Sequence, residues 1–156
     1  MRLRSLLHIL IVILGFSQPV HLSAEVTSLR VVLDGTRFTV PAFRHGGVLY
    51  ASLTEFASVL SFPMYVNDEA GKAEVRIADT RLKLTDRNPF VVVLSHRENI
   101  IREVYQLPVD VMKSAVAYYM PMASILPLLS RVWGKSLVLD QELPQLTVTT
   151  TARPVA

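Results

Sequence analysis

The chain has 156 residues, a formal net charge of +3 and no cysteine. The lack of cysteine excludes disulfides, thiolate metal sites and lipid attachment through an N-terminal cysteine. Without Arg2 and Arg4, which lie in the segment described next, the net charge falls from +3 to +1. No basic run then remains that would indicate nucleic-acid binding.

Residues 1–24 have the pattern of a secretory signal peptide. Two arginines precede the apolar run Leu6–Phe16, and small residues lead to Ala24. The eleven residues of this run are too few for a membrane-spanning helix, which needs about 20. We expect cleavage after Ala24, a periplasmic or extracellular location, and no stable membrane span afterwards; an uncleaved anchor is the alternative.

The first half of the remaining chain predicts a hairpin and a helix between short strands. Asp34-Gly35 favours a tight hairpin turn because the glycine accepts positive φ. Ser52 and Glu55 have the spacing of a capping box at a helix start, and the apolar positions 53–60 form one face. Strands are predicted over residues 31–33, 37–40, 48–50, 64–67, 73–77, 81–84, 91–94 and 105–109, with 95–103 a loop or edge strand.

A second helix is predicted near residues 120–132, before strands at 137–140 and 145–148. Pro121 fits its first turn, where a missing N–H costs no hydrogen bond. Pro127 requires either a start near Ser124 or a kinked helix. The helix has almost no polar face, so it is either buried on both sides or offers a patch to a partner.

The stretch from Tyr50 to Ile77 is repeated in the stretch from Tyr119 to Val148. Five positions match at an offset of 69: Tyr50 with Tyr119, Leu53 with Met122, Phe56 with Ile125, Ala57 with Leu126, and Leu60 with Leu129. Each copy continues with a strand ending in an acid, Asp68 or Asp140. This pattern predicts an α+β fold, an antiparallel sheet built from two strand–helix–strand–strand repeats with short helices packed on it.

These two copies carry a family resemblance. Tyr50-Ala51-Ser52-Leu53 and Tyr119-Met120-Pro121-Met122, each followed by a helix and two strands, resemble the copper amine oxidase N-terminal-like domain, also called a stalk domain. The resemblance spans residues 28–150, and we assign residues 25–150 to this domain and 151–156 to a flexible tail or linker. The chain departs from the family where a glycine follows each helix: we place Ser61 and Ser130 there.

The resemblance implies a location and no chemistry. In the oxidases, copper and the quinone belong to a separate catalytic domain. Similar domains of exported bacterial proteins often accompany cell-wall hydrolases. We therefore expect a non-enzymatic cell-envelope module that binds or spaces, with a cell-wall glycan or an envelope protein as partner. The alternative is the N-terminal regulatory or targeting region of a peptidoglycan hydrolase such as an N-acetylmuramoyl-L-alanine amidase.

No catalytic, metal or cofactor site is predicted. His45 and His96 lie in separate polar segments with no histidine nearby in sequence. Ser52 and Ser95 lack the glycine pattern of a nucleophile elbow. Asp68 and its counterpart Asp140 are interpreted as turn residues that bond their own backbone.

Three aromatic residues are candidates for a ligand or partner contact: Tyr118, Tyr119 and Trp133. The two tyrosines are adjacent on a predicted strand, so their side chains point to opposite faces and one of them is exposed. We hypothesise that the exposed tyrosine and Trp133, which we place after the second helix, contact a sugar ring or a protein. Packing in the core is the alternative.

Overall fold

The computed structural model describes residues 24–150, which form two helices and two β-sheets. The predicted signal peptide, up to residue 23, and the tail from residue 151 lie outside the described residues. The helices are α2 (Leu53–Val59) and α3 (Met122–Trp133). The α+β class predicted from the sequence is confirmed.

The larger sheet, sheet A, has seven strands in the order β11-β12-β1-β2-β3-β10-β9. Their bounds are β1 (Glu25–Leu33), β2 (Thr36–His45), β3 (Val48–Ser52), β9 (Met112–Lys113), β10 (Tyr118–Pro121), β11 (Lys135–Asp140) and β12 (Gln145–Thr150). The β1–β2 hairpin turns at Asp34 and Gly35, whose φ angles of 50° and 82° are both positive. This is the tight turn that the sequence predicts.

The smaller sheet, sheet B, is an antiparallel meander of five strands in chain order. Its strands are β4 (Met64–Asn67), β5 (Lys72–Ile77), β6 (Thr80–Thr85), β7 (Phe90–Ser95) and β8 (Ile101–Gln106). Residues 95–103, predicted as a loop or an edge strand, form the end of β7, a turn and the start of β8. β8 is an edge strand of sheet B. Three strands of sheet B, β6, β7 and β8, lie between the two repeats in the sequence.

The prediction of one antiparallel sheet is wrong in two respects. The strands form two sheets, and β1 pairs with β12 in parallel, with Val31 opposite Leu146. The antiparallel prediction rests in part on hairpin-length connections, which argue against parallel crossovers. That argument applies to strands that follow one another in sequence, whereas β1 and β12 are the first and last strands and need no direct connection.

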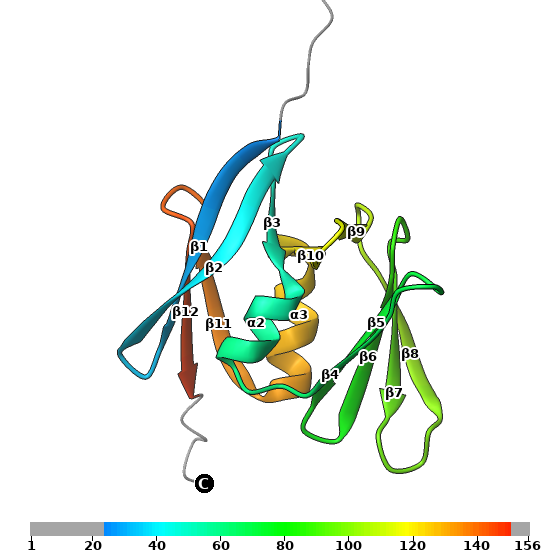
Figure 1. Cartoon of the computed structure of the whole chain (residues 1–156). Helices are drawn as coiled ribbons and strands as arrows, with labels where there is room; N and C mark the ends of the chain where they lie inside the picture. The colour runs from blue at the N-terminus through cyan, green and yellow to red at the C-terminus, as the bar shows by residue number, and fades with distance from the viewer. Residues whose placement is uncertain (1–23, 151–156) are drawn as a thin grey trace, which may run out of the picture.

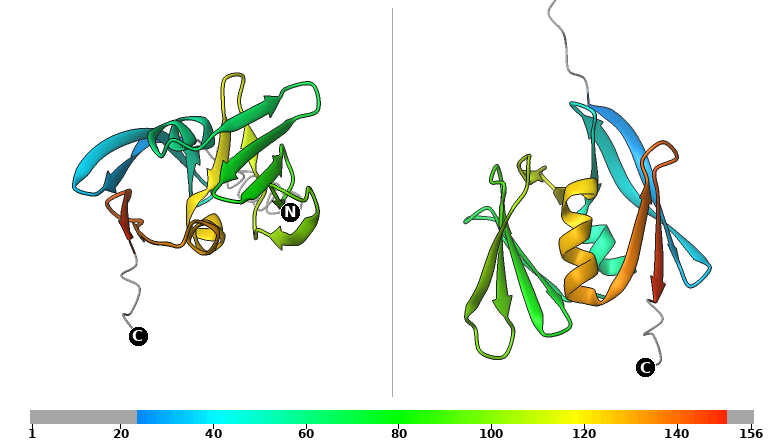
Figure 2. Two further views of the ribbon diagram at one scale, coloured as in Figure 1. Left: turned by 90° about the horizontal axis from the view of Figure 1, so that it is seen from below. Right: turned by 180° about the vertical axis from the view of Figure 1, so that it is seen from behind.

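The molecule has three layers, with both helices between the two sheets (Figure 1). The view from behind shows the same arrangement (Figure 2). Two contacts join α3 to sheet B: the Tyr105 hydroxyl donates to the Ser124 carbonyl at 3.2 Å, and Arg131 pairs with Glu103 at 2.7 Å. The apolar second helix is therefore buried on both sides, which decides between the two alternatives for its missing polar face.

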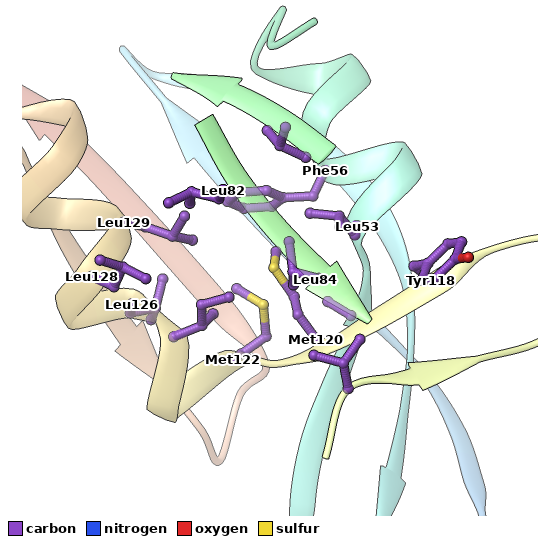
Figure 3. Packing of buried hydrophobic residues seen from close by; sticks show 14 of the residues in the cluster. Leu53, Phe56, Leu82, Leu84, Tyr118, Met120, Met122, Leu126, Leu128 and Leu129 are labelled. Atoms are coloured by element: carbon purple, nitrogen blue, oxygen red, sulfur yellow. The ribbon is translucent and has the colours of Figure 1, made fainter. Parts of the chain in front are cut away.

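One hydrophobic core lies between the sheets. Leu82 and Leu84 of sheet B belong to the same buried cluster as Phe56 of α2 and Leu129 of α3 (Figure 3). Pro127 lies inside α3, which starts at Met122 without a side-chain cap. The helix is therefore not delayed to Ser124, and it lacks the hydrogen bond that an N–H at position 127 would give.

β3 and β10 lie side by side and relate the two copies of the repeat. Their register sets Tyr50 opposite Pro121, Ala51 opposite Met120, and Ser52 opposite Tyr119. Replacing each residue by its counterpart 69 positions away exchanges the two outer pairs and leaves the central pair unchanged. A local two-fold axis therefore passes between Ala51 and Met120, both of which are 0% exposed.

The offset between the copies changes from 69 to 73 within the helix. α2 and α3 start 69 positions apart, whereas the hairpin β4–β5 matches β11–β12 at 73. The four added residues are about one helical turn, so the apolar face continues in phase. We call residues 42–77 the first unit and residues 111–150 the second unit.

This change corrects two of our matches. The counterpart of Asp140 is Asn67, since both end their strand and both side chains accept from the backbone N–H three residues later, at 3.0 Å. Asp68 instead pairs with Lys113 at 3.0 Å. The place after each helix holds Ser61 in the first unit and Gly134, not Ser130, in the second, and both have positive φ, 57° and 70°.

Candidate binding surface

Ser52 and Ser95, the two serines considered for a nucleophilic site, have structural roles. Ser52 caps α2, its Oγ accepting from the Glu55 backbone N–H at 3.2 Å. Ser95 is 0% exposed, and its Oγ accepts from the Arg102 guanidinium at 3.1 Å. Within residues 24–150, no three His, Asp or Glu side chains gather to hold a metal ion.

The two adjacent tyrosines do point to opposite faces. Tyr118 faces the core and is 2% exposed, whereas Tyr119 lies half-buried on the outer face of sheet A. The Tyr118 hydroxyl points away from the labelled side chains in Figure 3 and has no hydrogen-bond partner among the described residues. Burial raises the pKa of Tyr118; the Lys113 ammonium opposes this rise, and the carboxylates of Asp68 and Asp86 add to it. Tyr118 is therefore not available to a ligand at the surface.

Tyr119 belongs to an aromatic cluster on the outer face of sheet A. The Phe43 ring stacks on Tyr50, with centroids 5.2 Å apart and planes at 8°, and meets the Tyr119 ring edge-on at 5.0 Å. Tyr50 is 4% exposed, and burial, with a smaller effect of the Asp110 carboxylate, raises its pKa. Tyr50 is thus the fixed base of the cluster, on which the half-buried Phe43 rests.

A hollow of about 320 Å³ opens beside these rings. Its lining includes Val26, Phe43, His45, Met112, Lys113 and Tyr119. The register explains this gathering, because Val26 pairs with Phe43, and Met112 pairs with Tyr119. Neighbouring strands thus bring together apolar side chains, with the His45 imidazole beside them. We call this site the aromatic hollow.

Lys113 of sheet A forms an ion pair with a residue of the sheet B layer. Its ammonium pairs with Asp68 in the turn after β4, and this hydrogen bond raises the pKa of Lys113. Two backbone bonds close the same end of the molecule: Arg87 N–H donates to the Val111 carbonyl at 2.8 Å, and Val111 N–H donates to the Asn88 carbonyl at 3.2 Å. The short strand β9 is therefore held from both sheets.

Trp133 lies elsewhere. It is the last residue of α3 and not, as we expected, a residue after the helix. Its ring is half-buried, packs edge-on against Phe62 at 4.9 Å and has the Lys135 ammonium 4.9 Å from its centroid. Tyr119 precedes the other end of this helix, which is about 18 Å long. Trp133 and Tyr119 therefore do not form one site.

Sequence reasoning missed two aromatic residues that lie on the outer faces of the sheets. Phe43 follows the buried Val40 and Ala42 of β2, at a place where the alternation calls for a polar residue. Tyr65 of β4 is 67% exposed for the same reason. An aromatic residue on the solvent phase of a strand was the available signal, and we did not single it out.

No helix within residues 24–150 is long and apolar enough to cross a membrane. Comparison with protein-family models, with curated proteins and with solved structures finds no match to this chain.

Proposed function

We propose that this protein is a non-catalytic, exported cell-envelope module that binds cell-wall glycan through the aromatic hollow. The observation that carries the proposal is the pair of half-buried rings, Phe43 and Tyr119, on the outer face of a rigid sheet. Sugar rings present apolar C–H faces that pack on aromatic side chains, while polar groups at the margin bind hydroxyls. His45 supplies such a group here.

The scaffold favours binding without a large change of shape. Tyr50 is buried under Phe43, and Phe43 is held by its neighbours on both sides in the sheet, Val26 and Tyr50. A contact surface built on paired strands loses little conformational entropy when a ligand binds. The resemblance to envelope stalk domains and the predicted signal peptide support the same location and partner.

The test is retention of the purified protein on peptidoglycan sacculi. Phe43→Ala and Tyr119→Ala together should lower retention by at least about tenfold. Stacking of a base on one aromatic ring contributes on the order of 1–3 kcal/mol, and we take a sugar face on an aromatic ring to be comparable. Phe90→Ala is the matched control, because Phe90 is a 43% exposed aromatic residue on the other sheet. Val26→Asp, at a position 88% exposed, introduces a charge into the hollow without touching the core.

Failure has two distinct forms. If the wild-type protein is not retained by sacculi, the glycan proposal is wrong. If the wild type is retained and both the double variant and Val26→Asp bind equally well, the aromatic hollow is not the site. A thermal melt of each variant separates lost binding from lost folding.

A further inference from the structure

A second cluster of chemical groups lies on the outer face of sheet B, which neither α2 nor α3 covers. Two adjoining hollows of about 210 and 190 Å³ open there, and Tyr65 and Glu74 line both. The first hollow is also lined by Arg76, Arg81 and His96, and the second by Lys72 and Lys83. Tyr65 is 67% exposed, so its ring stands between two recesses that each contain cationic groups.

The strand register explains why these groups meet. Tyr65, Glu74 and Lys83 are opposite one another on β4, β5 and β6, and Arg76 is opposite Arg81. Alternate residues of β5 and β6 are buried, so Glu74, Lys83 and the two arginines point away from the core. Tyr65 is opposite Glu74 and shares this outer face. His96, from the turn after β7, reaches the same place.

The charges around Tyr65 are unequally paired. Glu74 binds Arg81 at 3.0 Å and Lys83 at 3.5 Å. Arg76 has no carboxylate within 4.0 Å in the described part of the chain, and its Nη1 donates to Nε2 of His96 at 3.2 Å. An imidazole that accepts this bond is neutral, so it orients the guanidinium without cancelling its charge. An exposed, oriented guanidinium is suited to a bidentate contact with a carboxylate.

Arg81 adds a second sign that the cluster is incomplete. Its Nη1 is bound to Glu74 and its Nη2 to the side-chain oxygen of Asn99. Its buried Nε–H has no acceptor among the described residues. Buried donors without a partner are uncommon in proteins, and a functional role is one of the usual reasons for them.

Comparison of the two units shows that the scaffold does not require these side chains. At the offset of 73, Tyr65 corresponds to Val138, Glu74 to Thr147 and Arg76 to Thr149. Val138 is 62% exposed, close to the exposure of Tyr65. The same hairpin is thus built without the ring or the charges, so the fold itself does not require them on β4 and β5.

We propose that the Tyr65 cluster binds an acidic saccharide, with a sugar ring stacked on Tyr65 and a carboxylate held by Arg76. The lone acid at the centre of the face favours a saccharide over a nucleic acid. Glu74 repels a row of phosphates, whereas its remaining lone pairs accept from sugar hydroxyls. This site shares no residue with the aromatic hollow, so the two proposals fail separately.

The probe is trigalacturonate, with its fully methyl-esterified form as a neutral copy of the same rings. Calorimetric titration at low salt should show the acid binding at least about tenfold more tightly than the ester, since a charge-assisted hydrogen bond is about twice as strong as a neutral one. Arg76→Gln should remove this preference. Arg37→Gln, which removes an exposed arginine from sheet A, should leave it unchanged.

Tyr65→Val, which copies the second unit, should weaken the acid and the ester alike. Added salt should weaken the acid alone, because the contact is exposed to solvent. The proposal is overturned if the ester binds as well as the acid, or if Arg37→Gln acts like Arg76→Gln. It is also overturned if a single-stranded oligonucleotide with the same number of charges binds more tightly than trigalacturonate.

Discussion

The first and second units have the same order of elements, but their hairpins join different sheets. Both consist of a strand, a helix and a hairpin, and they meet at the pair Ala51 and Met120. The hairpin of the first unit continues into β6 and becomes part of sheet B, whereas that of the second pairs with β1 and completes sheet A. The two units therefore share their buried positions and their order of elements. The sheet that each hairpin joins depends on the strand beside it, which is β6 for the first unit and β1 for the second.

The outward side chains differ most. The first unit carries Tyr65 and Arg76 where the second has Val138 and Thr149. Conversely, the second unit exposes Tyr119, whereas its counterpart Tyr50 is 4% exposed beneath Phe43. Each unit therefore places its accessible aromatic residue at a different point of the same framework, and the two candidate sites lie on opposite outer layers of the molecule.

The largest expected effect tests the shared plan itself. Phe56 and Ile125 occupy equivalent positions and are 2% and 1% exposed. Replacing either with alanine should lower the free energy of unfolding by about 2–5 kcal/mol, the usual cost of a large-to-small change in a core. Urea denaturation measures this loss. A cost below about 1 kcal/mol at one of the two positions would break the equivalence.

This equivalence was readable in the sequence because it rests on helical spacing alone. Leu53, Phe56 and Ala57 have the same phase as their counterparts, and all three are buried. The change of offset was not readable. An insertion of about one turn leaves every apolar residue on the same face, so the pattern matches equally well with or without it.

The pairing of strands into two sheets and the sites on the outer faces could not be predicted from the sequence, for a different reason. The parallel pairing of β1 with β12 depends on strands from the two ends of the described chain. The hollow beside Tyr119 likewise needs Val26 and Phe43, which reach it only through the register of sheet A. Local periodicity gives the direction of each side chain and does not say which strands are neighbours.

An intermediate effect is expected where the units differ after their helices. Gly134 and Ser61 both have positive φ, which costs a residue with a Cβ about 1 kcal/mol or more. Ser61→Gly should therefore stabilise the protein by about 0.5–1 kcal/mol, and Gly134→Ala should destabilise it by about 1 kcal/mol. A Cβ at Gly134 would meet no atom within 4 Å, so this cost is purely conformational.

Thermal melts of the two variants measure these opposite shifts. Gly35→Ala is a useful companion, since Gly35 also has positive φ and space for a Cβ but lies outside both units. It should lower the melting temperature as Gly134→Ala does. If Ser61→Gly lowers the melting temperature instead, Ser61 contributes a contact that outweighs its strained backbone, and the two helix ends are not equivalent.

The smallest effect is expected at Tyr118, whose buried hydroxyl has no counterpart in the core of the first unit. Tyr118 corresponds to Leu49 at the offset of 69, and both are buried, at 2% and 1% exposure. The Tyr118 hydroxyl has no partner among the described residues. Tyr118→Phe should therefore leave stability at neutral pH unchanged or raise it by about 1 kcal/mol, because it removes an unsatisfied polar group.

Alkaline pH provides the second measurement on the same residue. Burial raises the pKa of Tyr118 above its ordinary value of 10.0, so the folded state disfavours the phenolate. The associated stability is complete below pH 10 and is lost as the pH rises through the folded pKa. Urea denaturation from pH 8 to 11 should show a smaller alkaline loss for Tyr118→Phe than for the wild type. Wild type and Tyr118→Phe are compared at each pH, and the wild-type curve is the reference. Two results would contradict this expectation: Tyr118→Phe follows the wild-type curve, or it costs more than about 1 kcal/mol at neutral pH. In either case the hydroxyl has a partner, and the core of the second unit differs from that of the first by more than one unsatisfied group.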